Sequence, residues 1–271
     1  MSGTELVAPD AGALHAFGVG AATPVPLTGG RGLTWRAGGV VLRPHDGPSV
    51  TDWRADLLAD LEHSAGFRTP RPVATHDGSW RSGDWEAWEF VTGRADESRV
   101  EDVVQAGRAF HRAVAGVGRP AFLGTASTTV RAATDPWARA DRMAWGEEPL
   151  PTAPTLDRLA ASFRPVLSPS QLVHGDLLGN VLFAEGSAPT IIDWPPYWRP
   201  AAFGTAIAAV DAVCWHGVAV ERLDTLGAGE PEWRQLLVRA LAFRIATLHL
   251  LGAWDATSIA RHRAVVDAVA V

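Results

Sequence analysis

The sequence predicts an α+β fold built as two lobes, and three observations lead to this prediction. The first ninety or so of the 271 residues read as short strands around one helix. A glycine-marked junction follows, and beyond it apolar residues recur mainly at helical spacing. A compact strand–loop–strand segment interrupts this helical half. We therefore expect a strand-rich lobe over residues 1–92 and a larger helical lobe over residues 93–271.

In the first lobe, apolar Val40–Pro44 follows a glycine-rich stretch and predicts a strand. Thr51 or Asp52 can cap the next helix, which we expect to end at Gly66. A second strand is predicted over residues 85–91, and Thr-Gly closes it.

In the second lobe, helical spacing predicts one long helix directly after the junction and several more towards the C-terminus. Short apolar strands separate the two groups of helices. The expected helices cover 100–117, 135–145, 154–164, 203–220, 231–252 and 255–269, and the strands lie near 171–174, 180–184 and 190–193.

Composition excludes several classes of protein. The net charge of −6 gives no reason to expect nucleic-acid or membrane partners. No run of about 18 apolar residues and no signal-like N-terminal pattern occurs, and the single Cys214 predicts a reducing compartment. We therefore expect a cytoplasmic protein. All 24 basic residues are arginine, so any chemistry that needs lysine must use arginine instead.

The most informative segment is QLVHGDLLGNVLF, followed by TIIDW. It places His174, Asp176 and Asn180 among apolar residues, where polar groups are costly to bury without partners. This pattern, with Asp193 in IIDW, resembles the catalytic and metal-binding segments of the aminoglycoside phosphotransferase (choline kinase-like) family. That family has the bilobal protein-kinase-like fold. The resemblance covers most of the chain and is greatest to a poorly characterised actinobacterial branch.

The resemblance implies phosphoryl transfer from ATP with Mg²⁺. Asp176 would orient the acceptor hydroxyl and take its proton, while Asn180 and Asp193 would each offer an oxygen to Mg²⁺. The family usually has five residues from Asp to Asn, and here there are four. We expect Gly179 to permit the tighter loop and the two leucines before it to anchor the loop inward.

The resemblance also implies a nucleotide site in the first lobe. Arg43 stands where kinases carry their phosphate-binding lysine, and Asp56 is its expected acidic partner, with Glu62 as the alternative. ATP and GTP are not distinguished, because the junction would hold the base through its backbone. The remaining expected nucleotide contacts are the phosphate turn Gly29, Gly30, Arg31 and Gly32, which an ordinary hairpin turn explains equally well, and the junction residues Glu89, Phe90 and Val91.

Three further residues are expected to support the catalytic loop by hydrogen bonding. They are His174 in the loop, for which a direct catalytic role is the alternative, His111 in the first helix of the second lobe, and Asp211 in a later apolar helix.

The acceptor site is expected near residues 135–150 and 194–199. Arg199 could face an anionic substrate group, and the alternative is that the whole proline-rich segment is a packed, rigid turn. The candidate wall residues are Trp194, Tyr197, Trp198 and Arg199, and the acids available to a cationic acceptor are Asp135, Asp141, Glu147 and Glu148.

We therefore predict an ATP- and Mg²⁺-dependent small-molecule kinase. The acceptor would be a hydroxyl of a sugar, an amino sugar, an aminoglycoside-like compound or another alcohol. The main alternative is a nucleotide-binding pseudokinase with a regulatory or scaffolding role, motivated by Arg43 and the short loop. A metal-dependent hydrolase is a third hypothesis. The oligomeric state is left open.

Overall fold

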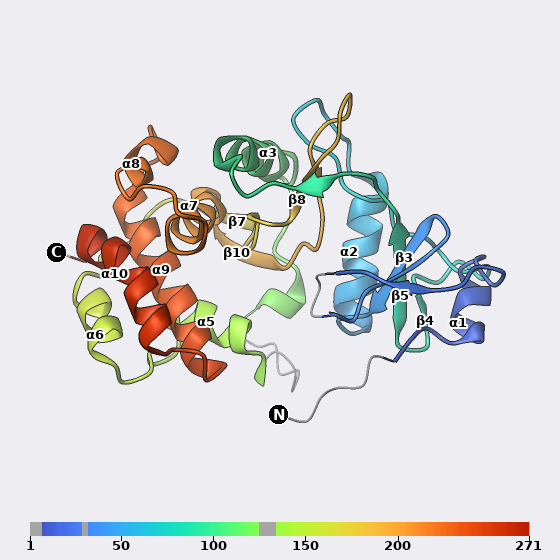
Figure 1. Ribbon diagram of the computed structural model, residues 1–271, viewed down its shortest axis with the longest axis horizontal. Coiled ribbons are helices and arrows are strands. Elements are labelled where there is room, and N and C mark those ends of the chain that lie inside the picture. Colours follow the sequence, from blue (N-terminus) through green and yellow to red (C-terminus); the bar gives the residue numbers. More distant parts are fainter. Residues whose placement is uncertain (1–6, 29–31, 125–133, 271) are drawn as a thin grey trace. The chain divides into compact units, whose positions relative to one another are not determined.

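The computed structural model describes residues 7–28, 32–124 and 134–270 and divides the chain into two compact units (Figure 1). Unit 1 takes the chain up to Arg94 together with Leu182–Asp193. Unit 2 takes Ala95–Val181 and the chain from Trp194 onward. The first boundary lies close to the predicted one. The segment Leu182–Asp193 differs from the prediction, because the sequence placed it in the second lobe.

Unit 1 is built on a five-stranded antiparallel sheet in the order β1-β2-β3-β5-β4. β3 pairs with β5 so that Arg43 lies opposite Glu86. One core cluster packs Leu42 and Ala87 of the sheet against Leu14 and Phe17. The elements are α1 (Ala11–Ala16), β1 (Val25–Pro26), β2 (Trp35–Ala37), β3 (Val40–Pro44), α2 (Pro48–Asp60), β4 (Arg81–Ser82) and β5 (Trp85–Glu89).

Helix α2 begins and ends earlier than predicted. Pro48 occupies the first turn, where its missing N–H costs no hydrogen bond, so neither Thr51 nor Asp52 is the cap. Thr51 is instead buried within the helix and accepts a hydrogen bond from the backbone N–H of Asp46. Extended backbone at Leu61 ends the helix before Gly66.

The segment Leu182–Asp193 joins unit 1 through backbone hydrogen bonds. The N–H of Arg68 donates to the carbonyl of Pro189, and the N–H of Ile191 donates to the carbonyl of Arg68, both at 2.8 Å. Strands β6 (Arg94–Ala95), β8 (Val181–Phe183) and β9 (Thr190–Ile191) form a small sheet in the order β6-β8-β9. These pairings join residues far apart in the chain, so the sequence pattern does not indicate them.

Unit 2 is mainly helical. Helices α7 and α9 are buried along most of their length and pack against each other, α5 packs on α9, and α3 packs on α7. This agrees with the predicted helical half. The elements are α3 (Val100–Ala113), η2 (Ala121–Leu123), α5 (Pro136–Ala144), α6 (Pro154–Ala161), β7 (Ser170–His174), β10 (Pro196–Pro200), α7 (Ala202–His216), α8 (Arg222–Leu226), α9 (Trp233–Leu250) and α10 (Ala256–Val269). None of the described helices is long and apolar enough to span a membrane.

The proline-rich segment after the IIDW motif is a strand rather than a turn. β10 pairs antiparallel with β7, with Pro196 opposite His174 and Pro200 opposite Ser170. Proline fits here because β10 lies at the edge of a two-stranded sheet, where its missing N–H need not break a ladder bond. This pairing fixes the chain beside the strand that leads into the HGD motif.

Candidate active site

In unit 2, the loop between β7 and β8 holds Asp176 and Asn180 against each other. The side-chain nitrogen of Asn180 donates to the backbone carbonyl of Asp176 at 2.7 Å and to its Oδ2 at 3.1 Å. The Oδ1 of Asn180 accepts no hydrogen bond within the described part of the chain. Asn180 thus orients the carboxylate of Asp176 and keeps one carbonyl oxygen available.

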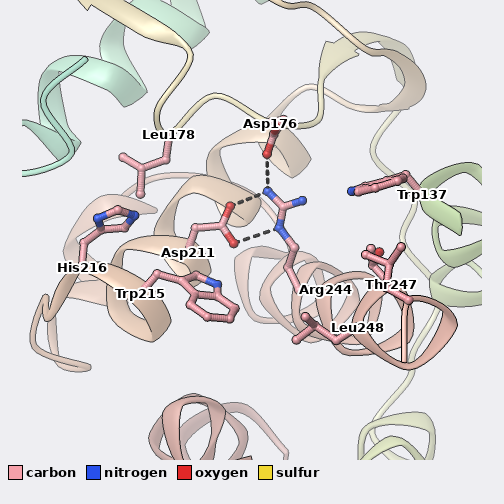
Figure 2. A pocket seen from close by; sticks show the side chains of 10 residues that line it. Trp137, Asp176, Leu178, Asp211, Trp215, His216, Arg244, Thr247 and Leu248 are labelled. Carbon is pink, nitrogen blue, oxygen red and sulfur yellow. Dashed lines mark hydrogen bonds and ion pairs between the residues drawn. The ribbon is translucent and has the colours of Figure 1, made fainter. Parts of the chain in front are cut away.

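Arg244 holds the other side of the Asp176 carboxylate. Its Nη2 donates to Asp176 Oδ1 at 2.7 Å and also contacts Asp211, while its Nε donates to Asp211 Oδ1 at 2.8 Å (Figure 2). Burial disfavours the charge on Arg244, but the two carboxylates raise its pKa, so it stays protonated. Asp211 is buried and the Asp176 side chain is 45% exposed. The network therefore anchors Asp176 from within while leaving it accessible.

His174 and His111 stabilise the start of this loop. The backbone N–H of His174 donates to His111 Nε2 at 2.9 Å, and the backbone N–H of Asp176 donates to His174 Nδ1 at 3.1 Å. His174 is completely buried, which favours the predicted structural role over a catalytic one. No group of three or more His, Cys, Asp and Glu side chains among the described residues is arranged to hold a metal.

The neutral state of His111 predicts a pH dependence of stability. Burial and the neighbouring His174 lower the pKa of His111 from 6.5 to about 3. The unfolded chain therefore binds a proton that the folded chain does not, and stability is lost as pH falls from about 6.5 towards about 3. We expect this group to contribute a slope of up to about 1.4 kcal/mol per pH unit. Urea unfolding across this pH range measures it.

His111→Gln is the matched variant for that experiment, because glutamine can still accept from His174 but does not titrate. The variant should have a shallower pH dependence than the wild type. Equal slopes for the two proteins would show that His111 does not contribute.

Gly179 allows the short loop between Asp176 and Asn180 to turn tightly. Its φ of +88° lies in the region that glycine adopts without strain, and the two residues before it are buried, Leu177 completely. The Leu177 side chain also packs against Gly107 of α3, where an added Cβ would lie 2.4 Å from it. The predicted tight turn with inward leucines is therefore present.

Replacing Gly179 with alanine should lower the free energy of unfolding by about 1–2 kcal/mol. A Cβ there would meet only Glu97, at 3.8 Å, so the cost comes from the backbone rather than from a clash. Chemical denaturation measures the loss. Gly118→Ala is the control, because Gly118 has open space around it and no positive φ. Equal stabilities for the two variants would contradict the role of the loop conformation.

In unit 1, Arg43 lies in a network of buried charges. Its Nε donates to Glu86 Oε1 at 2.6 Å and its Nη1 forms an ion pair with Asp193. Glu86 is 1% exposed and also accepts from Arg54 of α2 at 2.7 and 3.0 Å and from Trp88 at 3.1 Å. Burial favours the neutral acid, but Arg43 and Arg54 outweigh it and lower the pKa of Glu86.

The predicted pairing of Arg43 with Asp56 is wrong. Asp56 is exposed and accepts a hydrogen bond from Trp80 Nε1 at 2.7 Å. In its place, the buried acid comes from strand β5 and the helix contributes a second cation, Arg54. The cation Arg43 therefore lies on a strand as expected, whereas its acidic partner lies on a strand and not on the helix.

Asp193 ends the segment that joins unit 1 after β9. Its φ of +48° is unusual for a residue other than glycine, and its side chain is 50% exposed beside Arg43. The left-handed backbone and the ion pair together fix where this carboxylate points.

The predicted adenine-binding junction is partly occupied by the chain itself. The N–H of Glu89 donates to the carbonyl of Arg71 and the N–H of Phe90 donates to the carbonyl of Gly39, both at 2.8 Å. The N–H of Val91 has no hydrogen-bond partner within the described residues. Of the predicted phosphate turn, Gly32 has a φ of +71°, and Gly29, Gly30 and Arg31 lie outside the described residues.

The four predicted wall residues have different roles. Arg199 does not face an open site: it donates to Asp141 at 3.0 and 2.6 Å and to Glu147 at 2.8 Å. Trp194 is a core residue that donates to the carbonyl of Val173. Tyr197 packs on the ring of Phe243 and against Gly175, and Trp198 is half-buried on β10.

A pocket of about 290 Å³ opens beside Asp176, within unit 2. Of the expected acceptor region, only Trp137 contributes to it; most of its wall comes from the C-terminal ends of α7 and α9. The pocket is lined by Trp137, Asp176, Leu178, Asp211, Trp215, His216, Arg244, Thr247, Leu248 and Leu251 (Figure 2).

Sequence reasoning missed Arg244 and Glu86. Each is an isolated charge inside an apolar run, Arg244 in LAFRIATL and Glu86 in WEAW. A charged residue within a buried element needs a partner of opposite charge. The position of each residue within an apolar run therefore indicates a buried ion pair.

Comparisons with known proteins identify the family and the fold. A model of the phosphotransferase enzyme family matches residues 33–213, which is more than half of the chain. No curated protein matches the chain. The chain belongs to the phosphotransferase enzyme family and has its α+β, protein-kinase-like fold.

Three solved structures share this fold at low sequence identity. A microcompartment-associated aminopropanol kinase is 17% identical with a TM-score of 0.63, and 94% of each chain is covered. An aminoglycoside phosphotransferase in a ternary complex with ADP and hygromycin B is 17% identical with a TM-score of 0.60, covering 92% of this chain and 95% of that one. An aminoglycoside phosphotransferase from Alicyclobacillus acidocaldarius is 17% identical with a TM-score of 0.55, covering 99% and 98%.

Proposed function

We propose that this member of the phosphotransferase enzyme family transfers the γ-phosphoryl group of ATP to a hydroxyl of a small molecule. The observation that carries the proposal is Asp176, a half-exposed carboxylate held by Asn180 and Arg244 at the edge of a pocket. A carboxylate fixed in this way can orient a hydroxyl and take up its proton as the oxygen attacks.

The nucleotide site is proposed in unit 1. Arg43 is a permanently charged side chain that can contact phosphate oxygens with the N–H groups not used by Glu86 and Asp193. Burial disfavours the charged form of Arg43, but Glu86 and Asp193 raise its pKa overall, so it remains a cation. The N–H of Val91, which no described residue accepts, offers a backbone donor to the base and supports nucleotide binding without distinguishing ATP from GTP.

Asn180 and Asp193 are the proposed Mg²⁺ ligands. Each supplies oxygen, the ligand that this hard cation prefers. Asn180 keeps its Oδ1 free of hydrogen bonds within the described residues, and the Asp193 carboxylate is half-exposed. Bound Mg²⁺ would neutralise phosphate charge during the transfer. ATP and Mg²⁺ are both plentiful in the cytoplasm, and we propose that compartment for the activity.

Nucleotide binding and turnover together test the proposal. ATP with Mg²⁺ should raise the melting temperature, and a screen of alcohols should find one that stimulates ADP formation. A melting shift without turnover for any alcohol would favour the pseudokinase instead, and no shift with ATP or GTP would exclude both. Chelation of Mg²⁺ by EDTA should remove the turnover.

A further inference from the structure

The pocket beside Asp176 has a polar end and an apolar end. Asp176 and Arg244 form the polar end. The apolar surface comes from Trp137 and Trp215, which lie on opposite sides of Arg244 in Figure 2, and from Leu251. Trp215 and Leu251 are 39% and 47% exposed, and both line this pocket. Exposed apolar groups that line a pocket are the surface an apolar ligand would cover.

At the polar end, Arg244 has N–H donors that no described residue uses. Its Nε and Nη2 are used by Asp211 and Asp176, whereas Nη1 has no partner within the part of the chain that the structure describes. Figure 2 shows the remaining nitrogen of Arg244 pointing away from both carboxylates, towards Trp137. A bound molecule with an oxygen beside its reacting hydroxyl would therefore meet two N–H donors.

The acids that the sequence offered to a polycationic acceptor are already engaged. Arg199 binds Asp141 and Glu147, as described above. Glu148 accepts from Arg142 at 2.6 Å and from Arg139 at 3.3 Å, and Asp135 caps α5 by accepting from the backbone N–H of Ala138 at 2.8 Å. Asp141, Glu147 and Glu148 are each paired with arginine, so their attraction for a polycation is reduced.

The charge inside the pocket is small. Asp176 and Asp211 carry two negative charges and Arg244 one positive charge, so the group has a net charge of about −1. This balance suits a neutral molecule or one with a single positive charge. It does not suit a compound with several amines.

We propose that the acceptor is a compact alcohol with one aromatic or apolar body, a second oxygen beside the reacting hydroxyl, and at most one positive charge. The reacting hydroxyl lies at Asp176, the second oxygen accepts from Arg244 Nη1, and the apolar body covers Trp137, Trp215 and Leu251. This inference rests on the proposed phosphotransfer and narrows its substrate class.

Ligand-observed NMR titration of the full chain with ADP and Mg²⁺ tests the apolar end. Styrene glycol and phenyl glucoside are the aromatic probes, ethylene glycol and methyl glucoside are their counterparts without the ring, and kanamycin is the polycation. The aromatic probes should bind at least about fivefold more tightly than their counterparts and more tightly than kanamycin. Tighter binding of kanamycin, or no gain from the ring, would overturn the proposal.

Leu251→Glu and Leu167→Glu form a matched pair for the same titration. Leu251 lines the pocket, whereas Leu167 is an 85% exposed leucine of unit 2 that does not line it. Leu251→Glu should weaken binding of the aromatic probes about fivefold, and Leu167→Glu should leave it unchanged. Equal effects of the two variants would show that the probes bind elsewhere.

The polar end is tested by comparing styrene glycol with phenylethanol, which lacks the second hydroxyl. The diol should bind more tightly to the wild type, and its advantage should disappear in Arg244→Lys, which keeps a positive charge but loses the guanidinium fork. An advantage that persists would exclude Arg244 as the partner of the second oxygen. These are binding measurements, so they can fail while ATP still binds and turns over, and a loss of ATP binding would instead exclude the proposed function.

Discussion

Replacing Glu86 with alanine is expected to lower the free energy of unfolding of unit 1 by about 3–5 kcal/mol. Glu86 is almost completely buried and accepts hydrogen bonds from Arg43, Arg54 and Trp88. Its removal leaves two guanidinium groups with only their more exposed partners, Asp193 and Asp46. Uncompensated buried charge is among the few causes of so large a loss. Denaturant unfolding of the full chain measures it.

Glu62→Ala is the control, because Glu62 is an exposed acid of the same unit and was the alternative partner for Arg43. It should change stability by no more than about 0.5 kcal/mol. Similar losses for the two variants would show that the buried network does not stabilise unit 1.

The lowered pKa of Glu86 also determines how the stability of the fold changes with pH. A carboxyl whose folded pKa lies below its unfolded value of 4.5 stabilises the fold above that pH, and the contribution is lost as pH falls further. Wild type and Glu86→Ala should therefore converge in stability in acid.

The second large effect is on catalysis. Asp176→Asn should reduce the rate of phosphoryl transfer by roughly 10²–10⁴-fold, because an amide cannot take the proton of the acceptor hydroxyl. The fold should survive, since Arg244 keeps Asp211 as a partner and the amide oxygen can still accept from it. Nucleotide binding should be unchanged. Single-turnover phosphate transfer and the melting shift with ATP give the two measurements.

Asp267 of α10 forms a half-exposed ion pair with Arg158 of α6. Asp267→Asn makes the same chemical change there and should retain full activity. Wild-type activity in Asp176→Asn would exclude Asp176 as the base. Loss of the ATP-induced melting shift in that variant would instead indicate a binding defect.

Much of the local structure could be predicted because it depends on neighbouring residues. The strand Val40–Pro44 and the helices of unit 2 follow from apolar periodicity. The tight loop at Gly179 follows from the spacing of Asp176 and Asn180 and from the backbone freedom of glycine.

The partners of charged residues could be predicted less well, because they depend on tertiary packing. In α2, Arg54 and Leu58 are four residues apart and share the buried face, whereas Asp56 lies between them and points to solvent. Helical spacing therefore excludes Asp56 as a buried partner of Arg43 once the buried face of α2 is known. The sequence leaves Arg199 open between a substrate contact and a packed turn, because its partners, Asp141 and Glu147, are more than fifty residues away in the chain.

The guanidinium of Arg43 has a practical consequence for chemical probes of nucleotide sites. Reagents that acylate the phosphate-binding amine of kinases need a primary amine as nucleophile, and this chain has no lysine side chain to supply one. A protonated guanidinium paired with Glu86 and Asp193 is not nucleophilic. Such reagents should therefore leave the site unlabelled even when nucleotide is bound, and profiling by amine acylation would overlook this protein in a mixture of active kinases.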